Sequence, residues 1–178
     1  HTFHYSCSQR IGSRPSSRKG IRLKKRKAWI FDVDGTLANV DSILHHVRNK
    51  DRKSKKFKKY FDRFHLDSIH VPANEEVVDM LWKVCNDYDI IVVTARREEW
   101  RAHTSYWLVK NNVPNTALFM RGNKDDRSDY EIKKDILEHI SQFWDVVHAV
   151  DDNPKIIKLW EEYGIPTTKI GDWDGEYV

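Results

Sequence analysis

Cysteine is scarce in this sequence of 178 residues, and the scarcity excludes two common ways of stabilising a small fold. The two cysteines, Cys7 and Cys85, lie far apart and lack the spacing of a zinc-binding pair. We therefore expect neither a disulfide framework nor a cysteine-ligated metal, and we expect a reducing compartment such as the cytoplasm.

Long apolar runs are also missing. No window approaches the roughly 20 apolar residues that cross a bilayer, and the amino terminus lacks the apolar core of a secretion signal. We expect no membrane association. The seven Trp, seven Tyr and seven Phe residues can fill one sizeable core, so the sequence predicts one domain and no second catalytic domain.

Basic residues are in slight and uneven excess. The net charge is +4, and much of the basic excess precedes Lys59. Residues 1–26 are rich in Ser, Arg, Lys and Gly without an apolar period, which predicts a flexible basic arm ahead of a domain at residues 27–178. The first residue is His1, which is consistent with a fragment or an extension. A polyanionic partner such as nucleic acid explains this charge, and so does a solvated basic face.

Apolar runs typical of buried strands alternate with segments of helical period. The expected strands are residues 28–31, 89–96, 116–120, 146–150 and 167–170; the expected helices are 40–64, 74–84, 98–111, 128–140 and 153–164, with a loop at 65–72. The helix at 98–111 is expected to bury Trp100, Tyr106, Trp107 and Val109. This alternation predicts an α/β fold, a doubly wound parallel sheet of about five strands with right-handed crossovers.

Three of these strands end in polar side chains suited to phosphate and metal chemistry. They are Asp32 and Asp34 after the strand at 28–31, Thr94 and Arg96 at the end of 89–96, and Asp151 and Asp152 after 146–150. Each pair alone has an ordinary explanation, such as a polar Asp-Gly turn. Because ligands bind at the carboxyl ends of parallel strands, we expect all three pairs to meet in one site, and their convergence favours a function.

The carboxylates in this predicted site indicate its chemistry. Of two acids spaced like Asp32 and Asp34, one can attack a substrate while the other transfers protons. Asp151 and Asp152 are adjacent acids, which are costly to hold together unless a cation or a shared proton relieves their repulsion. A hard divalent cation with oxygen ligands is therefore expected between the strand ends.

Residues 29–37, Trp-Ile-Phe-Asp-Val-Asp-Gly-Thr-Leu, resemble the first motif of the haloacid dehalogenase (HAD) superfamily. Val-Val-Thr-Ala-Arg at 92–96 resembles the second motif, and Lys133 or its neighbour Lys134 stands where the third motif has a lysine. The resemblance implies a Rossmann-like phosphatase core in which Asp32 forms an aspartyl-phosphate and Asp34 acts as acid and base. It also implies Mg²⁺ bound by Asp32, the backbone carbonyl of Asp34, Asp151 and Asp152, and phosphoryl oxygens held by Thr94 and Lys133.

A narrower resemblance, to the 3′-phosphatase domain of phage polynucleotide kinase-phosphatases, covers nearly all of residues 27–173. It is also carried by Arg-Ser-Asp at 127–129, Ala-Val-Asp-Asp at 149–152 and Trp-Glu-Glu-Tyr-Gly-Ile at 160–165. It implies that Arg96 binds substrate phosphate and that Asp129 orients Lys133 or Arg96. The Gly-x-x-x-x-Gly-Lys-[Ser/Thr] loop of the kinase half of that family does not occur in this sequence.

An insert at about residues 40–73 stands where HAD enzymes carry a small helical cap, and it has no counterpart that aligns with the phage family. One face of its expected helix is strongly basic between Arg48 and Lys59. We expect this face to contact a phosphodiester backbone through Lys53, Lys55, Lys56 and Lys59. The alternative is a basic face that only keeps the protein in solution.

The strand-end residues predict a metal-dependent phosphatase, and the resemblance implies that it uses Mg²⁺ to remove 3′-phosphates from DNA or RNA in end repair. Its expected partners are single-stranded or nicked nucleic-acid ends and a separate kinase or ligase chain, in the cytoplasm of the host if the gene is viral. The alternatives are a nucleotidase or small-metabolite phosphatase, and a non-catalytic nucleic-acid binding module on a HAD scaffold. The sequence does not distinguish DNA from RNA or predict an oligomeric state.

Overall fold

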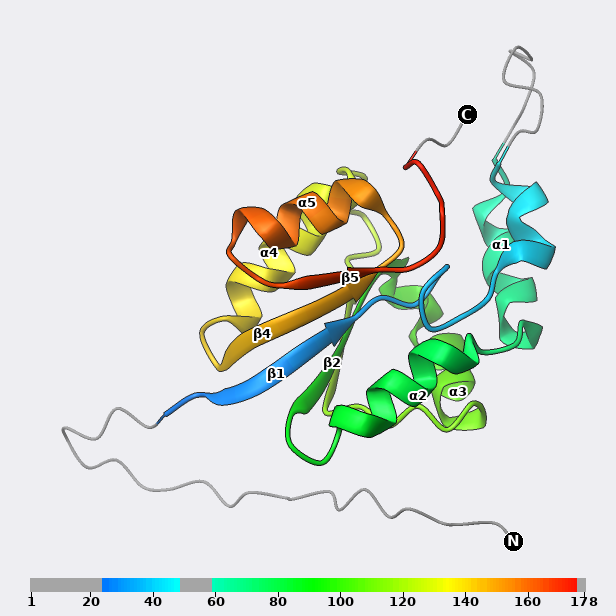
Figure 1. The fold of residues 1–178 in the computed structure, drawn as a ribbon. Helices are drawn as coiled ribbons and strands as arrows, with labels where there is room; N and C mark the ends of the chain where they lie inside the picture. Colours follow the sequence, from blue (N-terminus) through cyan, green and yellow to red (C-terminus); the bar gives the residue numbers. More distant parts are fainter. Residues whose placement is uncertain (1–23, 49–58, 176–178) are drawn as a thin grey trace, which may run out of the picture.

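The strand that carries the first motif, β1 (Arg26–Phe31), lies at the centre of a five-stranded sheet (Figure 1). In this computed structural model, which describes residues 24–48 and 59–175, the other strands are β2 (Asp89–Arg97), β3 (Ala117–Arg121), β4 (Trp144–Asp151) and β5 (Thr167–Lys169). All neighbouring strands run parallel in the order β3-β2-β1-β4-β5. The predicted doubly wound parallel sheet is confirmed.

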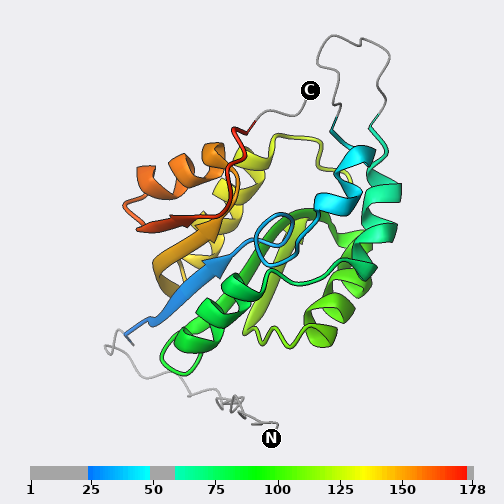
Figure 2. The same cartoon turned by 45° about the vertical axis from the view of Figure 1, so that its right-hand side comes forward.

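Two pairs of helices cover the two faces of the sheet (Figures 1 and 2). On one face lie α2 (Glu75–Val84) and α3 (Arg101–Lys110), and on the other lie α4 (Asp129–Ile140) and α5 (Pro154–Glu162). Successive strand residues point to opposite faces, so Phe31 packs in the cluster of α2 and α3, while Ile30 packs in the cluster of α4 and α5. Burial on both faces explains the nearly continuous apolar runs of β1 and β2.

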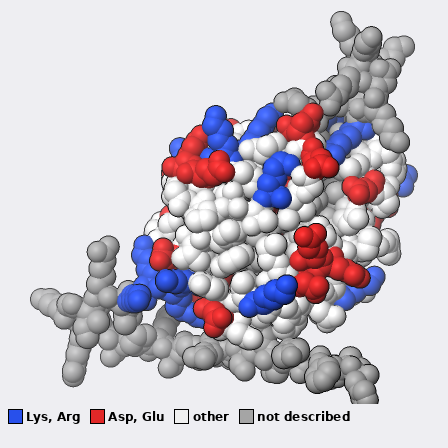
Figure 3. Space-filling model, in the orientation of Figure 1, with Lys and Arg blue, Asp and Glu red and all other residues white. Residues whose placement is uncertain are grey.

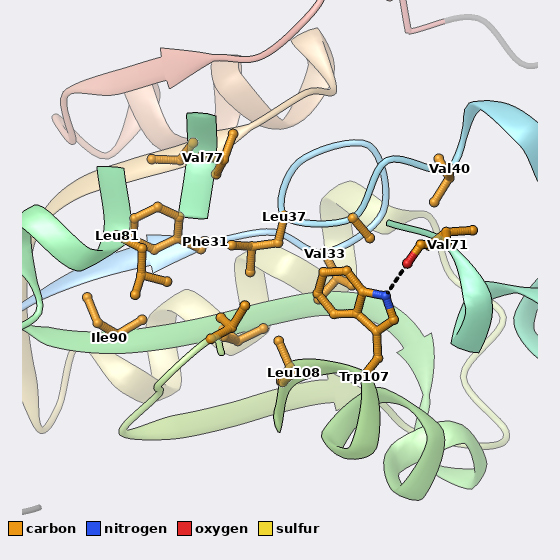
Figure 4. Packing of buried hydrophobic residues seen from close by; sticks show 14 of the residues in the cluster. Phe31, Val33, Leu37, Val40, Val71, Val77, Leu81, Ile90, Trp107 and Leu108 are labelled. Carbon is orange, nitrogen blue, oxygen red and sulfur yellow. Dashed lines mark hydrogen bonds between the residues drawn. The ribbon is translucent and has the colours of Figure 1, made fainter. Parts of the chain in front are cut away.

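The core beneath α2 and α3 is organised around Trp107, whose side chain is fully buried (Figure 4). Its indole Nε1 donates a 2.8 Å hydrogen bond to the backbone carbonyl of Val71, so the polar edge of the ring is satisfied inside the core. This bond ties α3 to the segment that returns from the insert.

The prediction for the helix before β3 is correct in position and wrong in orientation. A short 3-10 helix, η3 (Glu98–Trp100), precedes α3, and α3 buries Thr104, Trp107 and Leu108. That spacing of three and four residues is one helical face. Tyr106 and Val109 lie on the other face and are 56% and 78% exposed, because the predicted set mixed residues of two faces.

The insert folds back on itself and is not the single helix predicted for residues 40–64. It contains a 3-10 helix, η1 (Asp41–His46), and α1 (Phe61–Asp67), which lie beside each other at the carboxyl ends of the strands (Figures 1 and 2). The backbone N–H of Tyr60 donates to the carbonyl of His46 at 2.9 Å, whereas a continuous helix would separate these residues by about 20 Å. The loop predicted at 65–72 is also wrong in part, because α1 continues to Asp67 and a further 3-10 helix, η2, spans Ser68–His70.

Several predictions concern residues at the margins of the described structure. Residues 1–23 of the predicted basic arm and residues 49–58 of the insert lie outside the described residues, and Arg26 already belongs to β1. On the face shown in Figure 3, acidic and basic side chains are interspersed. Among residues 24–48 and 59–175, no helix has both the length and the apolar character needed to cross a bilayer.

Candidate active site

The ends of β1, β2 and β4 meet at one edge of the sheet, where a cleft of about 700 Å³ opens beneath the insert. The cleft is lined by all six residues that the strand ends predict, and also by Lys133: Asp32, Asp34, Thr94, Arg96, Lys133, Asp151 and Asp152. A larger hollow of about 960 Å³ lies near Lys25 and Trp144, at the amino ends of β1 and β4, away from these side chains. The side chains, and not the volume, therefore identify the candidate site.

Lys133 is buried between two aspartates. Its Nζ donates to Asp32 Oδ1 at 2.8 Å and to Asp151 Oδ2 at 2.7 Å, and the residue is only 3% exposed. Burial alone would lower the pKa of this lysine, but the Asp151 and Asp32 carboxylates outweigh it and raise the pKa, so the ammonium stays charged. The lysine on α4 that the sequence left undecided between Lys133 and Lys134 is therefore Lys133.

A capping box sets the start of α4 and thereby the position of Lys133. Ser128 precedes the helix, its hydroxyl accepts from the Glu131 backbone N–H, and its own backbone N–H donates to the Glu131 carboxylate at 3.1 Å. Lys133 then falls in the second turn of α4, on the face that packs toward the sheet.

Asp32, Asp151 and Asp152 form a buried carboxylate cluster, in which one oxygen of each lies within 4.8 Å of the others. Burial and the neighbouring carboxylates raise the pKa of Asp32 to about 7, although Lys133 opposes the shift. Burial and Asp32 raise the pKa of Asp152 to about 8. Asp152 accepts no hydrogen bond from any residue that the structure describes, although it is 8% exposed.

This donor set fits a hard divalent cation. Three buried carboxylates face one lysine, so the cluster has an uncompensated negative charge when all three are ionised. Oxygen ligands at this spacing suit Mg²⁺, which would relieve the repulsion that raises the two pKa values. Room for the cluster depends on Gly35, where a Cβ would lie 2.1 Å from Asp152 Oδ2 and where φ is +83°.

Asp34 is held by Arg96 in a bidentate pair, with Nε 2.9 Å from Oδ2 and Nη2 2.5 Å from Oδ1. Arg96 is 2% exposed, and its Nη1 donates to the Thr104 hydroxyl at 3.1 Å. Burial pushes the pKa of Asp34 upward, but the Arg96 guanidinium outweighs it and holds that pKa below its usual value. Arg96 was expected on substrate phosphate; in the structure its fork orients Asp34, whose backbone carbonyl is left for the predicted metal contact.

Asp129 also has a partner other than the expected ones. It forms an ion pair with Arg121, at the end of β3, and not with Lys133 or Arg96. Arg121 Nε donates in turn to the carbonyl of Ala95 at 2.9 Å, so this pair braces the end of β2. Thr94 lies there with its hydroxyl accepting from the Arg96 backbone N–H at 3.2 Å. The sequence analysis missed Arg121, for which a charged residue at a strand end was the available signal.

Aromatic residues on the cleft wall are the other group that sequence reasoning missed. Phe61, His65 and Trp100 line one part of the cleft, and Trp173, after β5, lines another. No local pattern groups them, because they come from three separate segments of the chain; Trp100, which was predicted to be buried, is partly exposed and lines the cleft. Of the predicted nucleic-acid contacts, Lys59 is exposed, whereas Lys53, Lys55 and Lys56 lie outside the described residues.

Most of the chain matches a known family of protein domains. The model of the polynucleotide kinase PNKP phosphatase domain matches residues 26–174, which include every strand of the sheet. The chain belongs to this family. As a PNKP phosphatase domain it is a HAD-type phosphatase, a class of hydrolases that act on phosphoric monoesters.

Individual relatives are more distant. A protein of Autographa californica nuclear polyhedrosis virus, assigned as a bifunctional polynucleotide kinase/RNA ligase, is 28% identical over 85 residues, which are 47% of this chain and 12% of that protein. A chain of the Pnkp1/Rnl/Hen1 RNA repair complex superposes with a TM-score of 0.66 at 22% identity, over 93% of this chain and 48% of that one. The chain thus spans about half, or less, of these matched proteins.

A HAD-family enzyme of Bacteroides thetaiotaomicron, solved as a magnesium complex, superposes with a TM-score of 0.50 at 15% identity, over 85% of this chain and 98% of that chain. At this identity the match supports the fold alone. The fold of the core is therefore shared beyond the PNKP phosphatase domains, and the support for a metal site in this chain comes from its own carboxylates.

Proposed function

We propose that this PNKP phosphatase domain removes terminal 3′-phosphates from DNA or RNA, with Mg²⁺, through an aspartyl-phosphate on Asp32. The observation that carries the proposal is the buried Lys133, which donates to both Asp32 and Asp151 beside Asp152. A lysine placed there keeps a carboxylate nucleophile next to the cation and phosphate that it must meet.

In the first step, a carboxylate oxygen of Asp32 attacks the phosphorus, and the bond to the 3′-oxygen of the sugar breaks. Asp34 gives its proton to that leaving oxygen. The Arg96 pair favours the ionised form of Asp34, but an arriving phosphate dianion brings two further negative charges and favours protonation of Asp34. The fixed fork of Arg96 keeps Asp34 in one orientation throughout.

In the second step, water attacks the aspartyl-phosphate. Asp34, now a carboxylate, takes the proton from that water, and the bond from Asp32 to phosphorus breaks to release inorganic phosphate. Thr94 and Lys133 line the same cleft and would hold phosphoryl oxygens as charge develops. Mg²⁺, bound by Asp32, Asp151, Asp152 and the backbone carbonyl of Asp34, would supply charge neutralisation.

The preference for a polynucleotide end rests on family membership and on the charge of the insert. The matched family is the phosphatase domain of polynucleotide kinases, and Lys59 is an exposed member of the basic stretch. The names of the similar proteins, an RNA repair complex and a kinase/ligase, support a role beside kinase and ligase activities on the same or another chain. The substrate is proposed to be a single-stranded or nicked end.

The test is phosphate release, with Mg²⁺ and with EDTA, from a 3′-phosphorylated oligonucleotide, its 5′-phosphorylated isomer and a 3′-mononucleotide. We expect preference for the 3′-phosphorylated oligonucleotide, no release in EDTA, and no release by Asp32→Asn. Equal or faster turnover of the mononucleotide would make the protein a nucleotidase. Binding without turnover in Mg²⁺ would favour a non-catalytic module.

Salt provides a second readout of polymer binding. Contacts between lysines and phosphates release counterions, so the KM for the oligonucleotide should rise steeply between 50 mM and 200 mM salt, while the KM for the mononucleotide should change little. A KM for the oligonucleotide that does not change with salt would contradict strand binding by the insert.

A further inference from the structure

One wall of the catalytic cleft is aromatic. Phe61 and His65 reach it from α1, and Trp100 reaches it from η3. The His65 ring stacks on Phe61, with centroids 6.3 Å apart, and its centroid lies 5.3 Å from that of Trp100. Phe61, His65 and Trp100 therefore form one continuous surface, which we call the aromatic wall.

The aromatic wall faces the cleft more than it packs into the core. Phe61 is 51% exposed, and Trp100 is partly exposed, whereas the neighbouring Phe64 is 5% exposed and belongs to the core beneath α2 and α3. Burial lowers the pKa of His65 to about 4, so this ring is uncharged at neutral pH. The wall therefore offers apolar ring surface without charge.

The cations of the cleft are less available to a ligand than their number suggests. Four arginines line it, and each has an aspartate partner: Arg96 with Asp34, Arg97 with Asp126, Arg121 with Asp129, and Arg127 with Asp125. A phosphodiester that tracked along the cleft would compete with these aspartates. Stacking of a base on an aromatic ring needs no free cation.

Trp173, an aromatic residue of the cleft that follows β5, is a poorer platform. The guanidinium of Arg48 lies 4.5 Å from the centroid of the Trp173 ring, so one face of that ring is already covered. Trp100 carries the largest ring system of the aromatic wall, and neither ring beside it is stacked parallel to it, since His65 is tilted by 44° and His103 lies edge-on at 78°. Trp100 is therefore the main candidate for stacking.

We propose that the aromatic wall stacks a nucleobase from one of the last two nucleosides of the strand, with Trp100 as the platform. The inference rests on the proposed phosphatase function and deepens it, since it names how the cleft would select a nucleic-acid end over other phosphate esters. Any of the bases can stack on an aromatic ring. The aromatic wall would therefore select phosphate esters that carry a nucleobase, without preferring a particular base sequence.

The test uses three 3′-phosphorylated oligonucleotides. One has all its bases, one has an abasic residue at the last position, and one has an abasic residue at the penultimate position. For the wild-type protein we expect kcat/KM to fall by about tenfold or more with one of the abasic substrates. In Trp100→Ala, kcat/KM for the substrate with all its bases should fall to the value that the wild type has for that abasic substrate. Trp100→Tyr, which keeps an aromatic face, should regain most of the preference.

The matched control is Tyr106→Ala, which removes an exposed aromatic residue of α3 outside the cleft and should keep the full preference. Phe61→Ala is the second probe if Trp100→Ala does not fold, and it should weaken the same preference. Equal turnover of all three substrates by the wild type, or full preference in both Trp100→Ala and Phe61→Ala, would overturn the inference while leaving the phosphatase function standing. No release from any of the three would overturn the phosphatase function itself.

Discussion

At the scale of single residues, the site consists of charges that hold one another in place. Lys133, Asp32 and Asp151 are all buried, and the Lys133 ammonium pairs with both carboxylates, which keep the lysine charged. The sequence could predict these side chains from the strand ends and the HAD resemblance. It could not predict that Arg96 would turn to Asp34, because that contact joins residues 62 positions apart.

Lys133→Met should unfold more easily and lose activity. Without the ammonium, the three buried carboxylates have no cation, which should cost about 3–5 kcal/mol in the free energy of unfolding in EDTA. Mg²⁺ should restore part of that stability, because the same carboxylates bind it. Thermal melting with and without Mg²⁺ measures both effects, and Lys134→Met is the control. Equal melting temperatures for the two variants in EDTA would contradict the structure.

Arg96→Lys should lower kcat by about ten- to a hundredfold with little change in KM, because lysine keeps the charge but not the fork that orients Asp34. Steady-state kinetics on the 3′-phosphorylated oligonucleotide measures the split, with Arg101→Lys, in an exposed pair with Glu98, as control. A raised KM with unchanged kcat would instead place Arg96 on the substrate, as the family resemblance implies.

At the scale of elements, local signals predicted most helices and strands, and failed where tertiary contacts compete. The capping box of α4 and the Asn153-Pro154 start of α5 are local, and both helices begin where expected. The prediction of a single helix in the insert failed because the apolar residues of the insert pack onto the core from two separate elements, η1 and α1. The buried face of α3 was also predicted wrongly, since periodicity alone does not show which side of a helix packs against the sheet.

The turn after β1 should tolerate no side chain at Gly35. Gly35→Ala would place a Cβ 2.1 Å from Asp152 Oδ2 at a φ of +83°, so we expect displacement of Asp152 and loss of Mg²⁺-dependent stabilisation. The control is Gly164→Ala, which also has a positive φ but no atom within 4 Å of its Cβ. It should cost only about 1 kcal/mol and keep the Mg²⁺ response in thermal melting.

At the scale of the whole molecule, the cleft lies between the sheet and the insert, so folding of the core and assembly of the site are coupled. Core residues of α2 and α3 share a cluster with Val47 and Phe64 of the insert. His65 makes this coupling depend on pH, because its titratable ring is buried when the insert packs on the sheet in the folded protein.

His65 should make the fold less stable as pH drops from 7 to 5, whereas Asp32 and Asp152, whose pKa values are raised in the folded state, act in the opposite direction. Burial lowers the pKa of His65 from 6.5 to about 4, so between these values only the unfolded chain binds the proton at this residue, and acid favours unfolding. The contribution of neutral His65 to the free energy of unfolding is fully present above pH 6.5 and is lost as pH falls toward 4. By pH 5 the loss is about 2 kcal/mol.

His65→Phe keeps an aromatic ring and removes the titration, so the change in the free energy of unfolding between pH 7 and pH 5, measured with urea, should be about 2 kcal/mol more favourable in the variant than in the wild type. His70→Phe, at an exposed position, should behave like the wild type. An equal pH dependence in His65→Phe and the wild type would contradict burial of His65.

The sequence by itself determined the class of this protein. The alternating apolar runs determined the parallel sheet, and that topology brings Asp32, Thr94 and Asp151 to one edge because parallel strands share their carboxyl ends. Only the tertiary structure decided which charges pair, how the insert turns back, and that Phe61, His65 and Trp100 meet on one wall. Those contacts join segments far apart in the chain, and neither residue type nor spacing encodes such distances.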